Sequence, residues 1–179
     1  VPLAGKSLDM HWLAEQGHRV VGIELSPVAV EAFFEEAGLA ARTGCEAGID
    51  YLEHGGIRLY CGDVFTLQTE HLLGATACYD RAALVALNVE MRRRYAAALA
   101  ALMPAGSSTL LVTVEYPQRE MSGPPFAVMG DEVERLFAAE FAVTDLQKTD
   151  VLGEEPKFRS RGVTAMRECA WQLIRVGQK

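Results

Sequence analysis

The 179-residue chain carries a net charge of −7, and half of its residues are apolar. This length favours a single domain, predicted over residues 1–179, with enough apolar residues for a sizeable core. The acidic balance argues against a nucleic-acid or anionic-membrane partner, because binding phosphates needs clustered lysine and arginine. The longest apolar runs also fall short of the roughly 18 residues that a membrane-spanning helix needs.

The cysteines and histidines do not show the spacing of a metal site. The cysteines are scattered without a CxxC pair, and the four histidines form neither an HExxH motif nor a pair with a cysteine. We therefore expect no metal, free thiols and a reducing, cytoplasmic environment. The expected state is a monomer that acts on a small molecule.

Helices and strands alternate along most of the chain. In chain order the predicted elements are a helix over 8–16, a strand over 19–23, a helix over 27–37, strands over 57–61 and 75–79, a helix over 89–102, a strand over 109–114, a helix over 131–139, and strands over 141–146 and 169–176. Residues 43–56 are rich in glycine and are predicted as loop with a short hairpin arm. Another long loop is predicted over 115–129.

Capping residues mark where the helices begin. Ser7, Ser26 and Asn88 are predicted N-caps, and Pro27 occupies the first helical position after Ser26. In the helix over 89–102 we expect the apolar side to face inward and the basic run 92–94 to be solvated. The residues expected inward are Met91, Tyr95, Ala98, Leu99 and Leu102.

The order of the elements predicts an α/β fold. Alternating strands and helices through residue 139 favour a parallel, doubly wound sheet, in which the apolar run 109–114 is buried on both faces. The last two strands face each other across the charged loop 148–162 and predict an antiparallel hairpin at the sheet edge. Nicotinamide-binding Rossmann domains do not normally end in this way, whereas the small methyltransferase fold does.

Ligands of such sheets bind at the carboxyl ends of the strands. Glu24 follows one strand and lies nineteen positions after Gly5, the offset at which nucleotide-binding folds place the acid that accepts from ribose hydroxyls. Asp63, after the next strand, could accept from an adenine amine. The alternative for each acid is a solvated loop residue or a helix cap. For Asp80 and Arg81, spacing alone does not separate a catalytic arginine from one that only pairs with the aspartate.

Sequence blocks along the whole chain are similar to one family. They are VPLAGKSLDM at 1–10, GH at 17–18 with VGIELS at 21–26, YCGDVF at 60–65, YDRAALVAL at 79–87, EY at 115–116 with GPPFAV at 123–128, and RG at 161–162. In these blocks the chain resembles the thiopurine S-methyltransferase family. The resemblance implies a class I S-adenosylmethionine-dependent methyltransferase fold, Rossmann-like and mostly parallel, with a C-terminal antiparallel hairpin. The implied reaction is in-line methyl transfer to the sulfur of small aromatic thiols such as thiopurines.

The resemblance also implies which residues bind S-adenosylmethionine. Leu3 and Gly5 would approach its methionine part, Glu24 would bind its ribose, and Asp63 and Val64 would border its adenine.

On the acceptor side the resemblance implies a set of arginines. Arg81 would lie between cofactor and acceptor, where it would both bind the cofactor and act as the catalytic residue, together with Asp80. Phe126 and an arginine of the last loop would contact the acceptor, with Arg159 and Arg161 as equal candidates.

The resemblance has one large departure and leaves alternatives open. The family's N-terminal, tryptophan-bearing segment over the cofactor is missing from the sequence, so we expect an open cofactor site with lower affinity. Ala4, where the family usually has cysteine, is a mild change. The alternatives are methylation of selenium or tellurium compounds on the same fold, a nicotinamide-dependent Rossmann oxidoreductase, and a binding module without activity.

Overall fold

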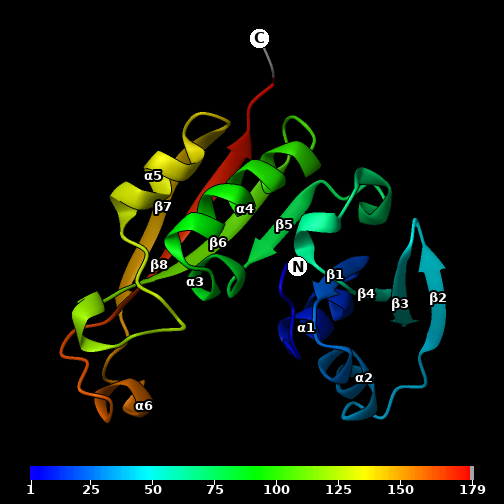
Figure 1. Cartoon of the computed structure of the whole chain (residues 1–179), viewed down its shortest axis with the longest axis horizontal. Helices are drawn as coiled ribbons and strands as arrows, with labels where there is room; N and C mark the ends of the chain where they lie inside the picture. The colour runs from blue at the N-terminus through cyan, green and yellow to red at the C-terminus, as the bar shows by residue number, and fades with distance from the viewer. Residues whose placement is uncertain (178–179) are drawn as a thin grey trace. The chain divides into compact units, whose positions relative to one another are not determined.

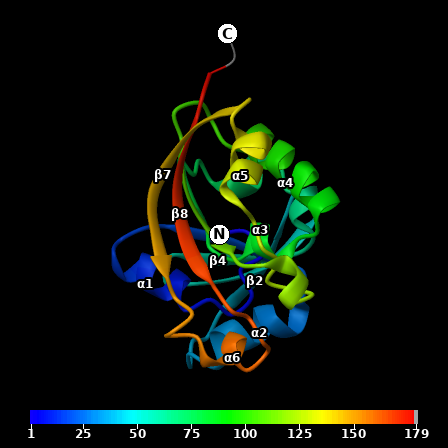
Figure 2. The ribbon, with the colours of Figure 1, turned by 90° about the vertical axis from the view of Figure 1, so that its left-hand side faces the viewer.

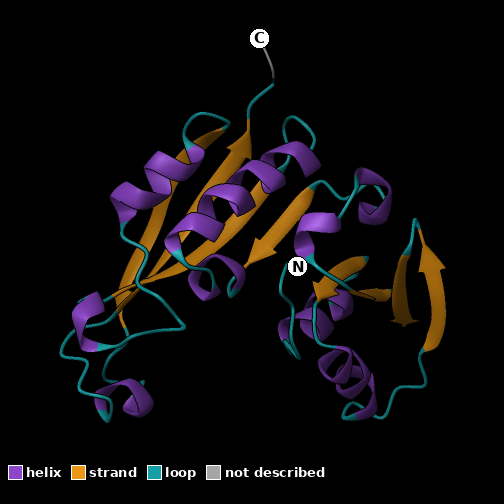
Figure 3. Ribbon diagram, in the orientation of Figure 1, coloured by secondary structure: helices purple, strands orange, loops and turns teal. Residues whose placement is uncertain are grey.

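The computed structural model describes residues 1–177, which form two compact units, Val1–Ala75 and a second unit that begins at Thr76. Each unit is built on its own four-stranded sheet (Figure 1; Figure 3). That the whole chain forms one methyltransferase domain stays a prediction. Within residues 1–177, no helix is both long and apolar enough to cross a membrane.

The first unit has a mixed sheet in the order β1-β4-β3-β2. Its elements are α1 (Asp9–Glu15), β1 (Val20–Glu24), α2 (Pro27–Glu35), β2 (Arg42–Glu46), β3 (Ile49–His54), β4 (Ile57–Cys61) and the short 3-10 turns η1 (Val64–Thr66) and η2 (Thr69–Leu72). The β1 and β4 strands are parallel, and the other two pairs are antiparallel. Beside β1, Pro2 forms an isolated parallel bridge with Ile23.

Local sequence signals in the first unit are mostly confirmed. Ser26 caps α2, because its Oγ accepts from Ala29 N at 3.3 Å, and Pro27 is the first helical residue. Ser7 is not the N-cap of α1, since Leu8 holds that position, although Ser7 Oγ accepts from Asp9 N at 3.3 Å.

The short hairpin arm predicted within residues 43–56 is confirmed, but the loop predicted around it is wrong, because β2 and β3 form an antiparallel hairpin that takes up most of this stretch and extends the sheet. Its apolar and polar residues do not alternate, which hid the length of the strands. Gly44 leaves room for the ring of Tyr51 on the facing strand, because a Cβ there would overlap the end of that ring and force it to move.

The second unit has a mixed sheet in the order β5-β6-β8-β7. Its elements are β5 (Ala77–Asp80), α3 (Ala83–Ala86), α4 (Val89–Leu102), β6 (Ser108–Glu115), the 3-10 turn η3 (Gln118–Glu120), α5 (Gly130–Phe137), β7 (Phe141–Asp150), α6 (Pro156–Arg159) and β8 (Arg167–Arg175). Both α4 and α5 lie on one face of this sheet (Figure 2). The predicted C-terminal hairpin is confirmed and is longer than expected, with α6 in its connecting loop.

The α/β fold class is confirmed, but the sheets are less parallel than predicted. The parallel pairs are β1 with β4 and β5 with β6, and β6 is antiparallel to β8 on its other side. The run 109–114 is therefore not a strand inside an all-parallel sheet. Leu110 of this run remains exposed.

The expectation that Arg92 faces solvent is wrong. Its side chain is 2% exposed and lies on the face of α4 that also buries Tyr95, Ala96 and Leu99. The guanidinium is paired in this position, because Nε donates to Leu87 O at 2.9 Å and Nη1 to both carboxylate oxygens of Glu132 at 2.9 Å. The charge of the run 92–94 suggested a solvated side chain, but the helical periodicity of α4 places residue 92 on its buried face. Met91, Ala98 and Leu102, expected inward, are only half-buried.

Candidate functional site

In the first unit, the turn at Leu3–Gly5 is tied to the acid at the end of β1. Gly5 N donates to Glu24 Oε2 at 2.9 Å, and Ser26 N donates to Oε1 at 2.9 Å. Leu3 (φ 47) and Gly5 (φ 53) both have left-handed backbone conformations, which curl the chain around the carboxylate. The structure therefore brings together two of the predicted cofactor residues, Gly5 and Glu24.

The space in front of this turn is suited to a ligand. A Cβ at Gly5 would meet no heavy atom within 4 Å, so the backbone faces open space. Glu24 is half-buried, and each carboxylate oxygen has a second lone pair after its bond to the backbone. The carboxylate therefore has acceptor capacity for two further hydrogen bonds.

Asp63 lies at the same edge of the first unit. Because β1 and β4 are parallel, Cys61 pairs with Glu24, and Gly62 N donates to Glu24 O at 2.9 Å. Asp63 is exposed and its Oδ1 accepts from Phe65 N at 3.0 Å, so it is also the N-cap of η1. Val64 is buried. Asp63 is therefore a helix cap, as the alternative interpretation predicted. The bond to Oδ1 leaves its exposed carboxylate with further lone pairs that can accept from a ligand.

In the second unit, Asp80 ends β5 and is buried, with 1% of its surface exposed. Its Oδ1 accepts from Ala83 N at 2.9 Å and Leu84 N at 3.3 Å, and Tyr95 OH donates to Oδ2 at 2.6 Å. Asp80 therefore fastens the end of β5 to α3 and α4. Next to it, Arg81 is exposed.

Burial raises the pKa of Asp80, against the opposing effect of its hydrogen bond from Tyr95. The folded state then favours the protonated acid, a contribution that is complete below the unfolded pKa of about 3.9 and is lost as the pH rises through the folded value. Asparagine stays neutral. We therefore expect the stability of Asp80→Asn relative to the unsubstituted chain to increase as the pH rises from about 4 to 7.

Urea denaturation at several pH values measures this difference. Tyr95→Phe is a companion variant, because losing the donated hydroxyl raises the pKa of Asp80 further and moves the pH-dependent loss upward. A difference between Asp80→Asn and the unsubstituted chain that is the same at every pH would show that Asp80 keeps an ordinary pKa.

The loop over 116–129 brings Phe126 to the segment that follows Asp80. Phe126 N donates to Val85 O at 2.7 Å, and the guanidinium carbon of Arg92 lies 5.8 Å from the centre of the Phe126 ring. Within the loop, Tyr116 OH donates to Pro125 O at 2.6 Å. The structure therefore groups the predicted acceptor residue Phe126 with α3 and α4.

The two candidate arginines of the last loop are placed differently. Arg159 ends α6, and Arg161 follows it with Nη1 3.9 Å from Met121 Sδ in the loop over 116–129. Both side chains are exposed. Arg161 therefore contacts the loop that carries Phe126, a distinction that sequence spacing did not make.

Sequence reasoning missed the residues that support this site. Tyr95 was expected only as an inward apolar residue, yet its hydroxyl binds Asp80, and burial raises the pKa of that hydroxyl. Gln118 Nε2 donates to Met121 O at 2.6 Å, and its Oε1 accepts from Ala127 N at 2.8 Å. The partner of Tyr95 lies 15 residues away, and the Gln118 bonds lie within an irregular loop, so no regular sequence pattern marks either residue.

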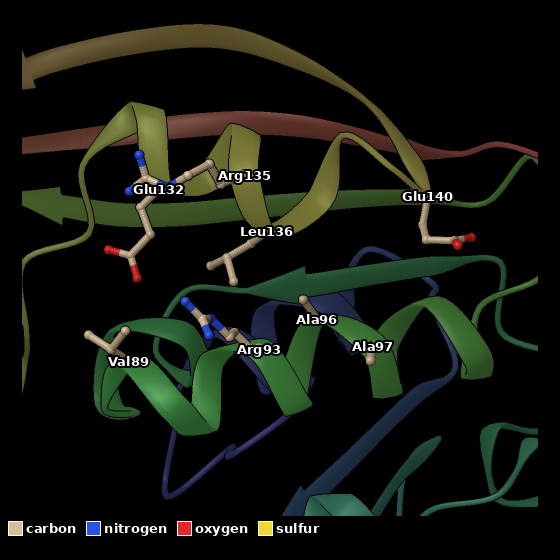
Figure 4. Close-up of a pocket in the computed structure, with 8 residues that line it drawn as sticks. All are labelled: Val89, Arg93, Ala96, Ala97, Glu132, Arg135, Leu136 and Glu140. Atoms are coloured by element: carbon tan, nitrogen blue, oxygen red, sulfur yellow. The ribbon is translucent and has the colours of Figure 1, made fainter.

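A hollow between α4 and α5 is separate from these residues (Figure 4). It is lined by Val89, Arg93, Ala96, Ala97, Glu132, Arg135, Leu136 and Glu140. Two of its acids have internal partners, because Glu132 binds Arg92 and Glu140 binds Arg175 at 2.9 Å. In the described part of the chain, none of the predicted site residues is among those lining residues, so we assign the hollow no part in the site.

The fold matches solved structures over nearly its whole length. The YcgJ protein from Bacillus is similar with a TM-score of 0.68 and 12% identity, over 99% of this chain and 91% of that one. A Methanosarcina mazei S-adenosylmethionine-dependent methyltransferase gives 0.67 and 12%, over 98% and 91%. Burkholderia thailandensis 1,6-didemethyltoxoflavin-N1-methyltransferase, solved with S-adenosylhomocysteine, gives 0.60 and 17%, over 98% and 69%. The fold is that of the class I S-adenosylmethionine-dependent methyltransferases.

Sequence comparison gives the family. A model of the thiopurine S-methyltransferase (TPMT) family matches residues 1–176. The thiopurine S-methyltransferases of Xanthomonas axonopodis pv. citri and Pseudomonas paraeruginosa are 49% and 50% identical over 175 residues, covering 98% of this chain and 80% of each relative. The chain belongs to the thiopurine S-methyltransferase family and is a methyltransferase, which decides against the nicotinamide-dependent alternative.

Proposed function

We propose that this chain transfers a methyl group from S-adenosylmethionine to the sulfur of a small aromatic thiol, with thiopurines as the first acceptors to test. The observation that carries the cofactor part is the hydrogen bond from Gly5 N to Glu24 at the open turn. The acceptor part is supported by family membership, since the relatives are named for thiopurines. A monomer in the cytoplasm stays a prediction.

The first unit supplies the groups for the cofactor. S-Adenosylmethionine, when bound, offers an electrophilic methyl group on a sulfonium. Glu24 accepts from the ribose hydroxyls, the backbone at Leu3 and Gly5 meets the methionine part, and Asp63 and Val64 border the adenine. These roles follow from acceptor capacity and open backbone at one edge of the unit.

The second unit supplies the groups for the acceptor. Arg81 is the proposed catalytic residue, because a guanidinium favours the thiolate form of the acceptor and orients it. Asp80 is buried and acts through the backbone, so its proposed role is to position Arg81. Phe126 and Arg161 are the proposed contacts to the acceptor ring. An aromatic thiol ionises readily and does not require a strong general base.

Two measurements on the intact chain test this proposal. Calorimetric titration with S-adenosylhomocysteine tests the cofactor, with NAD titrated in parallel as the control. Incubation with S-adenosylmethionine and a thiopurine, followed by mass spectrometry, tests whether the methyl group is on sulfur. Methylation only of selenium or tellurium compounds, or only of nitrogen or oxygen, would replace the proposed acceptor. Absence of S-adenosylhomocysteine binding would remove the cofactor assignment.

We expect Glu24→Ala to weaken S-adenosylhomocysteine binding by about 10- to 100-fold, the loss typical of hydrogen bonds to a charged group. The variant removes the proposed acceptor for the ribose and also releases Gly5 N and Ser26 N. Calorimetry measures the change. Glu35→Ala, which removes the same charge from the exposed side of α2, is the matched control and should bind normally. Equal affinity in both variants would contradict the ribose assignment.

A further inference from the structure

Two loops of the second unit form one cluster at the same end of the sheet (Figure 1). They are the β6–α5 loop, residues 116–129, and the β7–β8 loop, residues 151–166. The buried residues of this cluster are Tyr116, Ala127, Val163 and Met166, and Met121, Val151, Leu152 and Phe158 pack against them. The loop that carries Phe126 and the loop that carries Arg161 therefore share one small core.

A carboxylate bridges the two loops. Thr164 N donates to Glu120 Oε2 at 2.9 Å, and Thr164 Oγ lies 3.0 Å from both carboxylate oxygens. The side chain of Glu120 is 16% exposed, so this acid is largely withdrawn from water. Hydrogen bonds to an ionised, partly desolvated carboxylate are stronger than those between neutral groups. Arg119, 3.8 Å from Glu120 Oε1, is itself mostly exposed and adds little.

The bridge is connected to Arg161 through a short, ordered stretch of backbone. Val163 N and Arg161 N both donate to Phe158 O, at 3.2 and 3.0 Å, which closes a turn after α6. Val163 is buried in the shared core, and Thr164 follows it directly. The hydrogen bonds from Thr164 to Glu120 therefore also restrain the turn that carries Arg161. The guanidinium of Arg161 lies against Met121.

We propose that Glu120 and Thr164 are positioning residues that join the β6–α5 and β7–β8 loops into one acceptor-side wall. This inference rests on the proposed function, because it assigns the bridge to binding the thiol acceptor. Glu120 acts through Thr164 on Arg161 and does not itself meet the acceptor. Losing the bridge then raises KM for the acceptor, while binding of S-adenosylhomocysteine stays as it was.

The direction in which KM changes in Glu120→Ala distinguishes a positioning role from a general electrostatic effect of the carboxylate. Removing a carboxylate near arginines would by electrostatics alone favour an anionic thiolate and lower KM. Loss of the bridge raises KM, because Arg161 is no longer held. We expect Glu120→Ala to raise KM for the thiol about tenfold with a smaller change in kcat, as for loss of uniform binding.

The experiment compares Glu120→Ala, Thr164→Val and the conservative Thr164→Ser with the control Glu154→Ala. Glu154 is an exposed acid of the β7–β8 loop, so its loss gives the same change in charge without touching the bridge. Thr164→Ser keeps both donors and should retain the original KM. Thr164→Val keeps only N–H and should give an intermediate KM. Hydrogen exchange of residues 151–166 should accelerate in Glu120→Ala.

Each outcome supports or contradicts the positioning role of Glu120 and Thr164. An unchanged or lowered KM in Glu120→Ala, in a chain that methylates the thiol, overturns the bridge as a positioning device while leaving the proposed function in place. A rise in KM for Glu154→Ala of the same size also overturns it. If the unsubstituted chain binds S-adenosylhomocysteine but methylates no thiol, the proposed acceptor fails, and the assignment of the bridge to it fails as well. Accelerated exchange together with raised KM supports the bridge.

Discussion

Glu132→Ala is expected to lower the free energy of unfolding of the second unit by about 3–5 kcal/mol, the usual cost of breaking a buried ion pair from one side. Glu132 accepts two hydrogen bonds at 2.9 Å from Arg92 Nη1. Without it, a guanidinium that is 2% exposed loses this counter-charge and stays inside the protein. Urea denaturation followed by the fluorescence of Trp171, which is buried in β8, measures the change.

Two further variants separate charge burial from packing. Glu134→Ala changes an exposed acid of the same helix and should change stability by about 0.5 kcal/mol or less. Replacing both partners, Arg92→Met with Glu132→Leu, removes the buried charge and should cost much less than Glu132→Ala alone, because apolar pairs often substitute for buried ion pairs. A loss in Glu132→Ala no larger than in Glu134→Ala would show that the Arg92 guanidinium reaches water.

Regular elements were predictable where local signals and burial agree. The strand over 57–61 and the helix after Asn88 were found because capping chemistry and apolar periodicity indicate the same elements. The hairpin over 42–54 was predicted only as a short arm in a loop, because Gly44 and its polar neighbours have low strand propensity. Pairing with β4 supplies what propensity does not. Tertiary contacts of this kind leave no trace in a single sequence.

The candidate site also contains residues that the sequence predicted and residues that it did not. The rule that ligands bind at carboxyl strand ends found Glu24 and Asp63, because strand order follows from the elements. It did not find Tyr95 or Glu120, since the partners of these side chains lie 15 and 44 residues away. The basic run 92–94 also led us to expect a solvated Arg92, because its counter-charge, Glu132, lies 40 residues further along the chain. Groups that act directly are therefore more predictable here than the groups that support them.

Arg81→Ala is expected to lower kcat/KM for the thiol about 100-fold, the loss typical of removing one group that stabilises developing or bound negative charge. Arg81 is exposed at the end of β5, on backbone that the bonds from Ala83 N and Leu84 N to Asp80 hold in place. The guanidinium favours the thiolate and so lowers the apparent pKa of the acceptor thiol. In Arg81→Ala that pKa returns upward, and the pH profile of kcat/KM should move to higher pH, with partial recovery of rate there.

A pH profile distinguishes this role from a structural one. If Arg81 only paired with its surroundings, its loss would lower the rate by the same factor at every pH and would lower stability with it. Arg81→Lys keeps the charge without the planar fork, so it should keep the original pH profile and recover only part of the rate. Binding of S-adenosylhomocysteine should change little in either variant. An unchanged kcat/KM in Arg81→Ala, with normal cofactor binding, would contradict the catalytic role. The thiolate would then not depend on Arg81 for its stabilisation.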